Sequence, residues 1–430
     1  MNRLERIDGS ARFSGMHGAA ADLSGEFARI RARSEELAAP LSAEDACVQS
    51  MPDASPAKWH LAHTTWFFET FVLERFEPGF RPFRAEYRML FNSYYNKVGD
   101  KHPRQQRGML TRPPLAEVHD YRRDVDRRMQ HLLQDAAAHV FLRDLVALGL
   151  NHEQQHQELL LTDVKHLLSL NPLAPAYRER HAHPAAPGAP LEWVDFDRGI
   201  SAIGHRGTGF SFDNELPRHE VLLQPFRMAS RLVTNGEYLQ FVEQGGYADA
   251  QLWLAEGWDW VGQHRLAQPV YWRGEEDEWE EFTLGGLLPL DPALPVAHLS
   301  YFEADAYARW AGARLPTEEE WERGAAGCAV AGNFADDGAF HPLAAPPGRG
   351  LHQMFGDAWE WTQSSYAPYP GFRAAAGAIG EYNGKFMVNQ YVLRGGSCAT
   401  PADHIRLSYR NFFPTSARWQ FSGIRLARDS

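Results

Sequence analysis

The segment NHEQQHQELLL, residues 151–161, combines a pair of histidines with an apolar helical pattern, and it indicates a helical domain in the first half of the chain. Its histidines, His152 and His156, are four residues apart, so a helix places them one turn apart on one face. Two imidazoles at this spacing can bind one metal ion. The apolar run at 159–161 indicates that the same helix continues into a buried core.

A second histidine cluster lies upstream, in KWHLAHTTWFFE at 58–69. Either His60 or His63 can complete a three-histidine site from a different helix. Three imidazoles without a carboxylate suit Zn, Fe, Ni or Cu, so the residue types alone do not choose the metal. The segment at 152–156 also matches the HExxH pattern of zinc proteases, with Glu153 as the general base, which is a second class of enzyme to consider.

The residues around these motifs predict an all-α domain followed by a linker. Apolar side chains recur at helical spacing through 27–171, for example at 120–133 and 140–150, and predict a bundle of about four helices. Residues 1–26 lack this periodicity and are expected to form a flexible tail. Residues 172–190 contain five prolines among many alanines, which predicts an interdomain linker.

The remainder of the chain, residues 191–430, has a different pattern. Short apolar runs broken by Gly, Pro and Asn predict an α+β domain rich in loops. Of the 13 tryptophans only two precede residue 190, which leaves 13 − 2 = 11 in this part of the chain. We expect one helix at 301–311 and another beginning after Thr317, where Glu320 completes a capping-box spacing.

The composition excludes several classes of protein. The chain has 430 residues and a net charge of −12, and a nucleic-acid partner is not expected without a basic field. No run is long and apolar enough to span a bilayer, so no membrane partner is expected. The three cysteines are far apart, without CxxC spacing, which favours a reducing cytoplasm. We therefore expect a cytoplasmic protein with small-molecule substrates; the oligomeric state is left open.

Two sets of motifs resemble a known family. Four segments resemble the DinB-type helical domain of the EgtB family, the sulfoxide synthases of ergothioneine biosynthesis: KWHLAHTTWFFE, LFNSYYN, HPRQQRG and NHEQQHQE. Four later segments are similar to the formylglycine-generating-enzyme or sulfatase-modifying domain, a C-type-lectin-like α+β fold: RLPTEEEWERGA, GDAWEWTQSSY, YVLRGGSC and FSGIRLARD. The formylglycine oxidase itself is disfavoured, because only Cys398 follows the Gly-Gly-Ser segment.

The resemblance implies a reaction and a cofactor. Members of the family bind a non-haem Fe(II) through three histidines, which by motif position are His63, His152 and His156. They use O2 to join a sulfur donor to C2 of the imidazole ring of hercynine, the betaine of histidine, and the product is a sulfoxide. His60 would then lie behind the ligands.

The resemblance also assigns roles to residues near these motifs. Tyr94 and Tyr95 would line the iron pocket, and a tyrosine hydroxyl there could donate a proton or hydrogen-bond the sulfur donor. Arg104 and Arg107 are three residues apart, so they could grip a carboxylate together, and in the family arginines at this motif bind the sulfur donor. Gln155 would contact hercynine.

Three residues of the C-terminal domain complete the expected site. Asn411 and Phe412 would lie near the betaine, where an aromatic ring suits a trimethylammonium group. Phe413 would lie near the sulfur donor. Relatives that use γ-glutamylcysteine carry Asp where this chain has Phe413, and this difference favours a smaller donor such as cysteine.

Several alternatives stay open at this point. A selenoneine synthase of the SenA type would use the same two domains and hercynine, with a selenosugar as donor. A zinc-dependent DinB-type thiol transferase or hydrolase would use the same three histidines without O2. A non-catalytic binding module built on the lectin-like fold would need none of them. The sequence does not identify the donor, the tyrosine that gives the proton, or a calcium site in the C-terminal domain.

Overall fold

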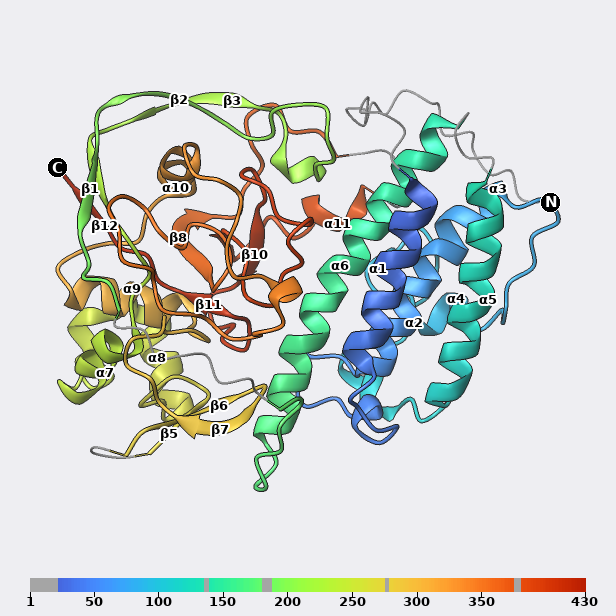
Figure 1. Ribbon diagram of the computed structural model, residues 1–430, viewed down its shortest axis with the longest axis horizontal. Helices are drawn as coiled ribbons and strands as arrows, with labels where there is room; N and C mark the ends of the chain where they lie inside the picture. Colours follow the sequence, from blue (N-terminus) through green and yellow to red (C-terminus); the bar gives the residue numbers. More distant parts are fainter. Residues whose placement is uncertain (1–21, 135–138, 180–187, 275–277, 375–379) are drawn as a thin grey trace. The chain divides into compact units, whose positions relative to one another are not determined.

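Long helices dominate the first half of the chain and short strands the second (Figure 1). The computed structural model describes residues 22–134, 139–179, 188–274, 278–374 and 380–430. The tail expected at 1–26 lies almost entirely outside the described residues, and so does the centre of the expected linker, at 180–187. The described chain forms two compact units. The first comprises the described residues within 1–167, 206–216 and 371–386, and the second comprises those within 168–205, 217–370 and 387–430.

The first unit is the predicted helical bundle. Its four long helices are α1 (Leu23–Ala38), α2 (Ala57–Phe67), α5 (Leu115–Leu133) and α6 (Val140–Ser169). Shorter helical segments connect them or join the unit from later in the chain: η1 (Asp45–Cys47), η2 (Phe68–Leu73), α3 (Glu74–Phe76), α4 (Tyr87–Leu90), η3 (Arg104–Met109), η5 (Asp213–Glu215) and α11 (Glu381–Gly384).

Local sequence signals explain where these helices begin. α1 begins four residues before the boundary expected at Phe27, because the side chain of Asp22 accepts a hydrogen bond from the Gly25 N–H and caps the helix. Both α2 and α5 begin directly after a proline, Pro56 and Pro114, whose fixed φ suits a helix start and whose missing N–H needs no partner there.

The α2 helix is the buried centre of the bundle. Every residue of Ala57–Phe67 is buried, and the helix continues into a π-helical turn, η2. Trp66 and Phe67 belong to one apolar core with residues of α1, α5 and α6. Burial on all sides forces the polar groups of α2, its histidines included, to find partners within the bundle.

The second unit is the predicted α+β domain. Its strands form four small sheets, with the orders β1-β4-β12, β10-β9-β8-β11, β2-β3 and β5-β6-β7. All neighbouring strands are antiparallel except β8 and β11. The strands are β1 (Trp193–Phe196), β2 (Gly199–Ile203), β3 (His219–Leu223), β4 (Phe226–Ala229), β5 (Trp272–Arg273), β6 (Glu280–Thr283), β7 (Gly286–Pro289), β8 (Trp359–Ser365), β9 (Gln390–Arg394), β10 (Asn411–Pro414), β11 (Ser422–Gly423) and β12 (Ala427–Asp429).

Helices accompany these sheets, and two of them confirm sequence predictions. The helices are α7 (Asn235–Glu243), η6 (Ala250–Leu252), α8 (Ala255–His264), α9 (Tyr301–Trp310), α10 (Glu318–Ala325) and η7 (Ala335–Asp337). α9 is the helix expected at 301–311. At α10 the Glu320 N–H donates to the Thr317 hydroxyl (3.1 Å) and the Thr317 N–H donates to the Glu320 carboxylate (2.9 Å), which confirms the capping box.

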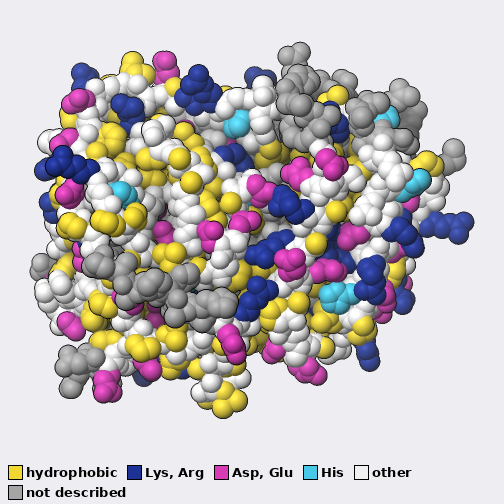
Figure 2. All heavy atoms as spheres, viewed as in Figure 1, with side chains coloured by type: hydrophobic (Ala, Val, Ile, Leu, Met, Phe, Trp, Pro, Cys, Tyr) yellow, Lys and Arg dark blue, Asp and Glu magenta, His cyan; other side chains and the backbone are white. Residues whose placement is uncertain are grey.

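The surface carries both signs of charge. Figure 2 shows acidic and basic side chains interspersed on the face drawn. Within the described ranges, no helix combines the length and the apolar character that crossing a bilayer requires.

Candidate metal centre

Three histidines from two helices of the first unit converge. His63 lies on α2, while His152 and His156 lie one turn apart on α6. One ring nitrogen from each lies within 4.8 Å of the others, close enough for a single metal ion between them. The ring centres are separated by 4.6 to 5.0 Å. The sequence left His60 and His63 open as the third ligand, and the geometry groups His63 with the pair on α6.

Aromatic rings and a backbone carbonyl hold His63 in place. Its imidazole is stacked between Trp59 (4.5 Å between ring centres, 13° between planes) and Trp66 (5.4 Å, 15°). Its Nδ1 lies 2.6 Å from the carbonyl oxygen of Phe91, which can only accept a hydrogen bond. The proton of the neutral ring is therefore on Nδ1, and the lone pair of Nε2 is left for a metal.

Burial keeps the three rings neutral. Burial lowers the pKa of His152 to about 4. It lowers the pKa of His63 and of His156 well below the usual value, and the neighbouring histidines lower both further. Neutral imidazole is the form that binds metals.

One buried nitrogen also supports a metal. The Nδ1 atom of His152 is buried and has no hydrogen-bond partner among the described residues. A buried polar atom without a partner is rare and calls for an explanation such as an ion. The residues therefore fit a metal held by three imidazoles, a donor set that accommodates iron, zinc, copper or nickel.

His60 lies behind the cluster. Its Nδ1 is 2.8 Å from Nδ1 of His156, and its Nε2 is 3.0 Å from the Asp163 carboxylate. Both of its ring nitrogens are thus engaged, and His60 supports His156 instead of joining the three converging nitrogens.

Glu153 faces the bundle interior in a position that contradicts the zinc-protease alternative. Its carboxylate accepts hydrogen bonds from Arg31 (2.8 Å), Arg122 (2.6 Å) and the Ser34 hydroxyl (2.6 Å). Burial alone would raise the pKa of Glu153, but the two arginines outweigh it and lower the pKa to about 2. A carboxylate so paired and so weakly basic cannot serve as the general base of a HExxH protease.

Arg107, one of the two arginines predicted to bind a substrate carboxylate, lies close to the histidines. The Arg107 guanidinium lies 3.4 Å from the centre of the Trp59 ring, on which His63 is also stacked. It donates to the Ser55 and Ser93 hydroxyls, at 2.8 and 2.9 Å. Burial lowers the pKa of Arg107 to about 9, which leaves it charged at neutral pH.

No carboxylate of the described residues neutralises either arginine. Arg104 donates to the Tyr94 hydroxyl (2.7 Å) and to the Asp53 carbonyl, and its buried Nε has no partner among the described residues, as is also true of Arg107. In that part of the chain neither guanidinium forms an ion pair with a carboxylate. Two neighbouring cations without a counter-charge form a suitable site for an anionic group.

The two predicted tyrosines occupy different surroundings. Tyr94 is partly buried, accepts the hydrogen bond from Arg104, and meets Phe386 edge to face at 4.9 Å. Tyr95 is buried in the bundle core, where its ring packs against Trp66 (5.6 Å) and Phe71 (5.1 Å). Tyr94 is therefore associated with the arginine pair, and Tyr95 with the tryptophan beside His63.

The other predicted substrate contacts are divided between the two units. Gln155 is half-buried on α6, next to His156. Asn411, Phe412 and Phe413 lie on β10 in the second unit, which pairs with β9. There the Phe412 ring stacks on Tyr366, with 4.0 Å between centres and 11° between planes. Phe413 packs edge to face against a tryptophan, at 5.7 Å.

Three residues of this centre were missed by the sequence analysis: Ser55, Trp59 and Asp163. A signal existed for Asp163, because it follows His156 by seven residues and so lies on the same helix face two turns later. The same signal marked Trp59, which precedes His63 by four residues on α2. No comparable signal marked Ser55, since its position depends on how the helices pack.

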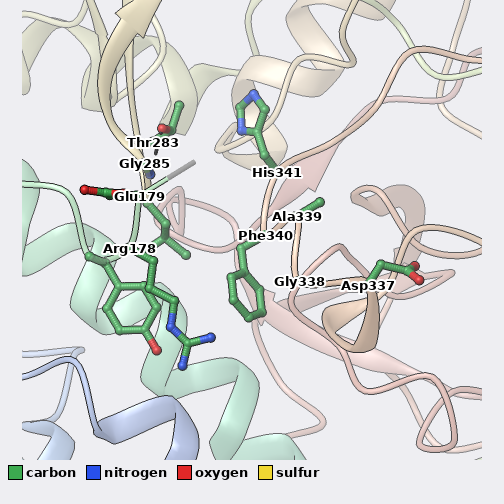
Figure 3. A pocket seen from close by; sticks show the side chains of 11 residues that line it. Arg178, Glu179, Thr283, Gly285, Asp337, Gly338, Ala339, Phe340 and His341 are labelled. Carbon is green, nitrogen blue, oxygen red and sulfur yellow. Dashed lines mark hydrogen bonds between the residues drawn. The ribbon is translucent and has the colours of Figure 1, made fainter. Parts of the chain in front are cut away.

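The second unit contains a cavity of about 270 Å³ (Figure 3). In its lining, the Arg178 guanidinium lies 5.2 Å from the ring centre of Tyr177 and 5.8 Å from that of Phe340. The backbone N–H groups of Tyr177 and Arg178 donate to the Leu284 carbonyl. None of the residues predicted to act in the reaction lines this cavity, and we assign it no part in the chemistry.

Two family models match the chain, one for each predicted domain. The DinB superfamily matches residues 26–160. The sulfatase-modifying factor enzyme 1-like domain matches residues 195–347 and 338–430. The first match contains all three converging histidines and both arginines.

Two curated relatives match most of this chain in sequence, and a third matches about half of it. A hercynine oxygenase of Mycobacterium tuberculosis is 33% identical over 95% of this chain and 98% of its own length. A hercynine oxygenase of Mycolicibacterium thermoresistibile is 32% identical over 88% of each chain. The ergothioneine biosynthesis protein 1 of Schizosaccharomyces pombe is 30% identical over 51% of this chain and 28% of its own length.

Proposed function

The chain belongs to the EgtB family of hercynine oxygenases, and on that premise we propose that it is an Fe(II)- and O2-dependent sulfoxide synthase. The reaction would join a thiol donor to C2 of the hercynine imidazole. The thiol loses S–H, the ring loses C2–H, a C–S bond forms, and one atom of O2 becomes the sulfoxide oxygen while the other leaves as water. O2 accepts all four electrons, so no other reductant is needed.

The convergence of His63, His152 and His156 is the observation that carries this proposal. Their nitrogens lie within 4.8 Å of one another, and burial keeps the rings neutral. Fe(II), when bound by these residues, would supply the redox chemistry that activates O2. Three protein ligands leave positions for substrates, as a catalytic metal requires.

The arginine pair supports an amino-acid donor. Arg104 and Arg107 present two cations that no carboxylate neutralises within the described residues, and the carboxylate of a thiol donor such as cysteine would supply the missing charge. The bound carboxylate would orient the donor, so that its sulfur is held near the histidines. The Tyr94 hydroxyl accepts a hydrogen bond from Arg104 and would therefore be held beside the donor. Tyr95 packs against Trp66, the ring that stacks on His63.

Hercynine recognition would involve the remaining predicted residues. Gln155 would offer its amide, and Asn411 and Phe412 would contact the betaine, with the Phe412 ring suited to the trimethylammonium group. Phe413 would contact the sulfur donor. Phe413, in place of an Asp, favours cysteine over γ-glutamylcysteine. We place the reaction in the cytoplasm, where thiol donors are kept reduced.

Product analysis tests this proposal. The metal-free protein would be reconstituted with Fe(II) without oxygen, supplied with hercynine and cysteine, γ-glutamylcysteine or a selenosugar, and then exposed to O2. We expect mass spectrometry to find a hercynyl-cysteine sulfoxide with the wild type, none with His156→Ala, and the wild-type amount with His119→Ala, which alters a histidine of α5 that pairs with Glu35.

The other outcomes distinguish the alternatives. A selenium adduct formed only from the selenosugar would identify a selenoneine synthase. A product that forms equally well without O2 and with Zn²⁺ would identify a zinc-dependent thiol transferase. No O2-dependent product from any donor would contradict the proposed function.

A further inference from the structure

A chain of hydrogen bonds leads from the metal cluster to a buried carboxylate. His156 Nδ1 lies 2.8 Å from His60 Nδ1, and His60 Nε2 lies 3.0 Å from the Asp163 carboxylate. The carboxylate and His60 are buried, with 6% and 3% of their surface exposed, so water does not compete freely for these bonds. All three residues belong to the helical unit.

The chemistry of these groups fixes the direction of the hydrogen bonds. A carboxylate only accepts, so the proton between Asp163 and His60 belongs to His60 Nε2. In the neutral ring, His60 Nδ1 is then an acceptor, and the proton between the two rings belongs to His156 Nδ1. The lone pair of His156 is left on Nε2, the nitrogen that a metal would use.

We propose that Asp163 and His60 are positioning residues that hold His156 in its metal-binding tautomer and orientation. This inference rests on the metal site of the proposed function. In this arrangement His60 accepts the N–H of His156, and the Asp163 carboxylate accepts the N–H of His60. Such hydrogen bonds behind a metal ligand also make that ligand a better electron donor. His63 achieves the same tautomer through the Phe91 carbonyl, so the two helices use different partners for the same purpose.

The carboxylate end of the chain is itself fixed. The Ser55 N–H donates to the same Asp163 oxygen at 2.7 Å, and the Ser55 hydroxyl accepts from Arg107 at 2.8 Å. One serine therefore connects the arginine expected to bind the donor to the carboxylate behind His156. Asp163 cannot rotate away from His60 without losing the bond to Ser55.

Titration with Co(II) under anaerobic conditions tests the proposal, because Co(II) replaces Fe(II) in such sites and its visible absorption reports ligand geometry. Three variants would be compared with the wild type. His60→Phe keeps a ring and removes both nitrogens. His60→Asn keeps an oxygen acceptor near the place of Nδ1. His119→Phe is the matched control, because it removes a histidine that bonds a carboxylate elsewhere in the same bundle (3.4 Å).

We expect His60→Phe to weaken Co(II) binding by about 10- to 100-fold and to shift the visible spectrum, as loss of a partner behind a metal ligand does. His60→Asn should recover much of the affinity, and His119→Phe should match the wild type. The unfolding temperature of each metal-free variant shows whether the variant is folded. It therefore separates misfolding from loss of the hydrogen bonds between His156, His60 and Asp163.

Four results would overturn the inference. His60→Phe could bind Co(II) with unchanged affinity and spectrum. His60→Asn could lose as much affinity as His60→Phe, which would indicate simple loss of packing. If His60→Phe does not fold, Asp163→Asn replaces it, because the amide keeps the shape of the carboxylate but removes its charge. An unchanged affinity of Asp163→Asn for Co(II) would contradict the proposed role of Asp163. A wild-type protein that binds no Co(II) would overturn the proposed metal site together with the positioning role of Asp163 and His60.

Discussion

Two neighbouring faces of α6 each carry a pair of polar residues four apart. One pair forms the candidate metal site, and the other is hydrogen-bonded within the bundle. His152 and His156, four residues apart, converge on His63, and one ring nitrogen of each histidine lies within 4.8 Å of the others. Glu153 and Gln157 are also four residues apart, and their side chains form hydrogen bonds with residues of α1 and α5. Glu153 is bound by two arginines and a serine, and the Gln157 amide donates to the Ile30 carbonyl (2.9 Å) and to the Ser34 hydroxyl (3.0 Å).

The same contrast exists between two pairs of arginines. Arg31 and Arg122 are paired with Glu153 inside the bundle. Arg104 and Arg107 form no ion pair within the described residues. Groups that the fold has satisfied stabilise the fold, whereas buried groups that it leaves without a partner are available to a ligand. The predictions below test this division of α6, and they begin with the largest expected effect.

The Glu153→Leu substitution should destabilise the helical unit most. It removes the carboxylate and leaves Arg122 and Arg31 buried with one charge partner fewer, which costs about 3–5 kcal/mol of unfolding free energy. Urea denaturation of the metal-free protein measures this. Asp120→Asn, which breaks an exposed pair with Arg123 on α5, should change the stability by less than about 1 kcal/mol. An equal loss of unfolding free energy in the two variants would contradict a special stabilising role for the buried pairs of Glu153.

Acid should remove the contribution of Glu153. Its pKa is about 2 in the folded protein and is lower than in the unfolded chain, so the stabilisation is complete above about pH 4.5 and is lost as the pH falls toward 2. The difference in unfolding free energy between wild type and Glu153→Gln should shrink by about 3 kcal/mol over this range. A difference that does not change with pH would mean that the carboxylate is not held by the arginines as described.

The Arg107→Lys substitution should weaken donor binding and leave hercynine binding intact. Lysine keeps the charge but cannot present the fork that reaches two serines while stacking on Trp59. We expect KM for cysteine to rise about 10- to 100-fold, corresponding to about 1.4–2.7 kcal/mol. Steady-state kinetics with each substrate varied in turn checks this. Arg127→Lys, at an exposed pair with Asp124, is the control.

The Gln157→Leu substitution should have the smallest effect. It removes two hydrogen bonds on the satisfied face of α6, and the Ile30 carbonyl keeps the Ser34 hydroxyl as a donor, so the loss is about 1 kcal/mol. Thermal unfolding measures the loss, and the affinity for Co(II) should be unchanged. A fall in metal affinity as large as that of a histidine variant would erase the distinction between the two faces.

The sequence predicted much of this molecule because its main signals are local. Helical periodicity identified the bundle, the spacing of His152 and His156 identified the helix face, and the Thr317 capping box identified the start of α10. A capping hydrogen bond between residues three apart is specified by the residues that make it.

Other features depend on packing between helices and could not be predicted. The zinc-protease alternative failed because the direction of Glu153 is decided by Arg31 and Arg122, which lie 122 and 31 residues away along the chain. The choice between His60 and His63 required the relative rotation of α2 and α6. Nothing in the local sequence places Ser55 between Asp163 and Arg107.

The iron content of three proteins tests the central claim most directly, because His152 and Glu153 are adjacent residues on the two faces. Wild type, His152→Ala and Glu153→Gln would be loaded with Fe(II) without oxygen, passed through a desalting column and analysed for metal, with folding checked by circular dichroism. We expect about one iron per chain in the wild type and in Glu153→Gln, and almost none in His152→Ala. Iron retained by folded His152→Ala, or lost from folded Glu153→Gln, would contradict the assignment of the metal to the histidine face.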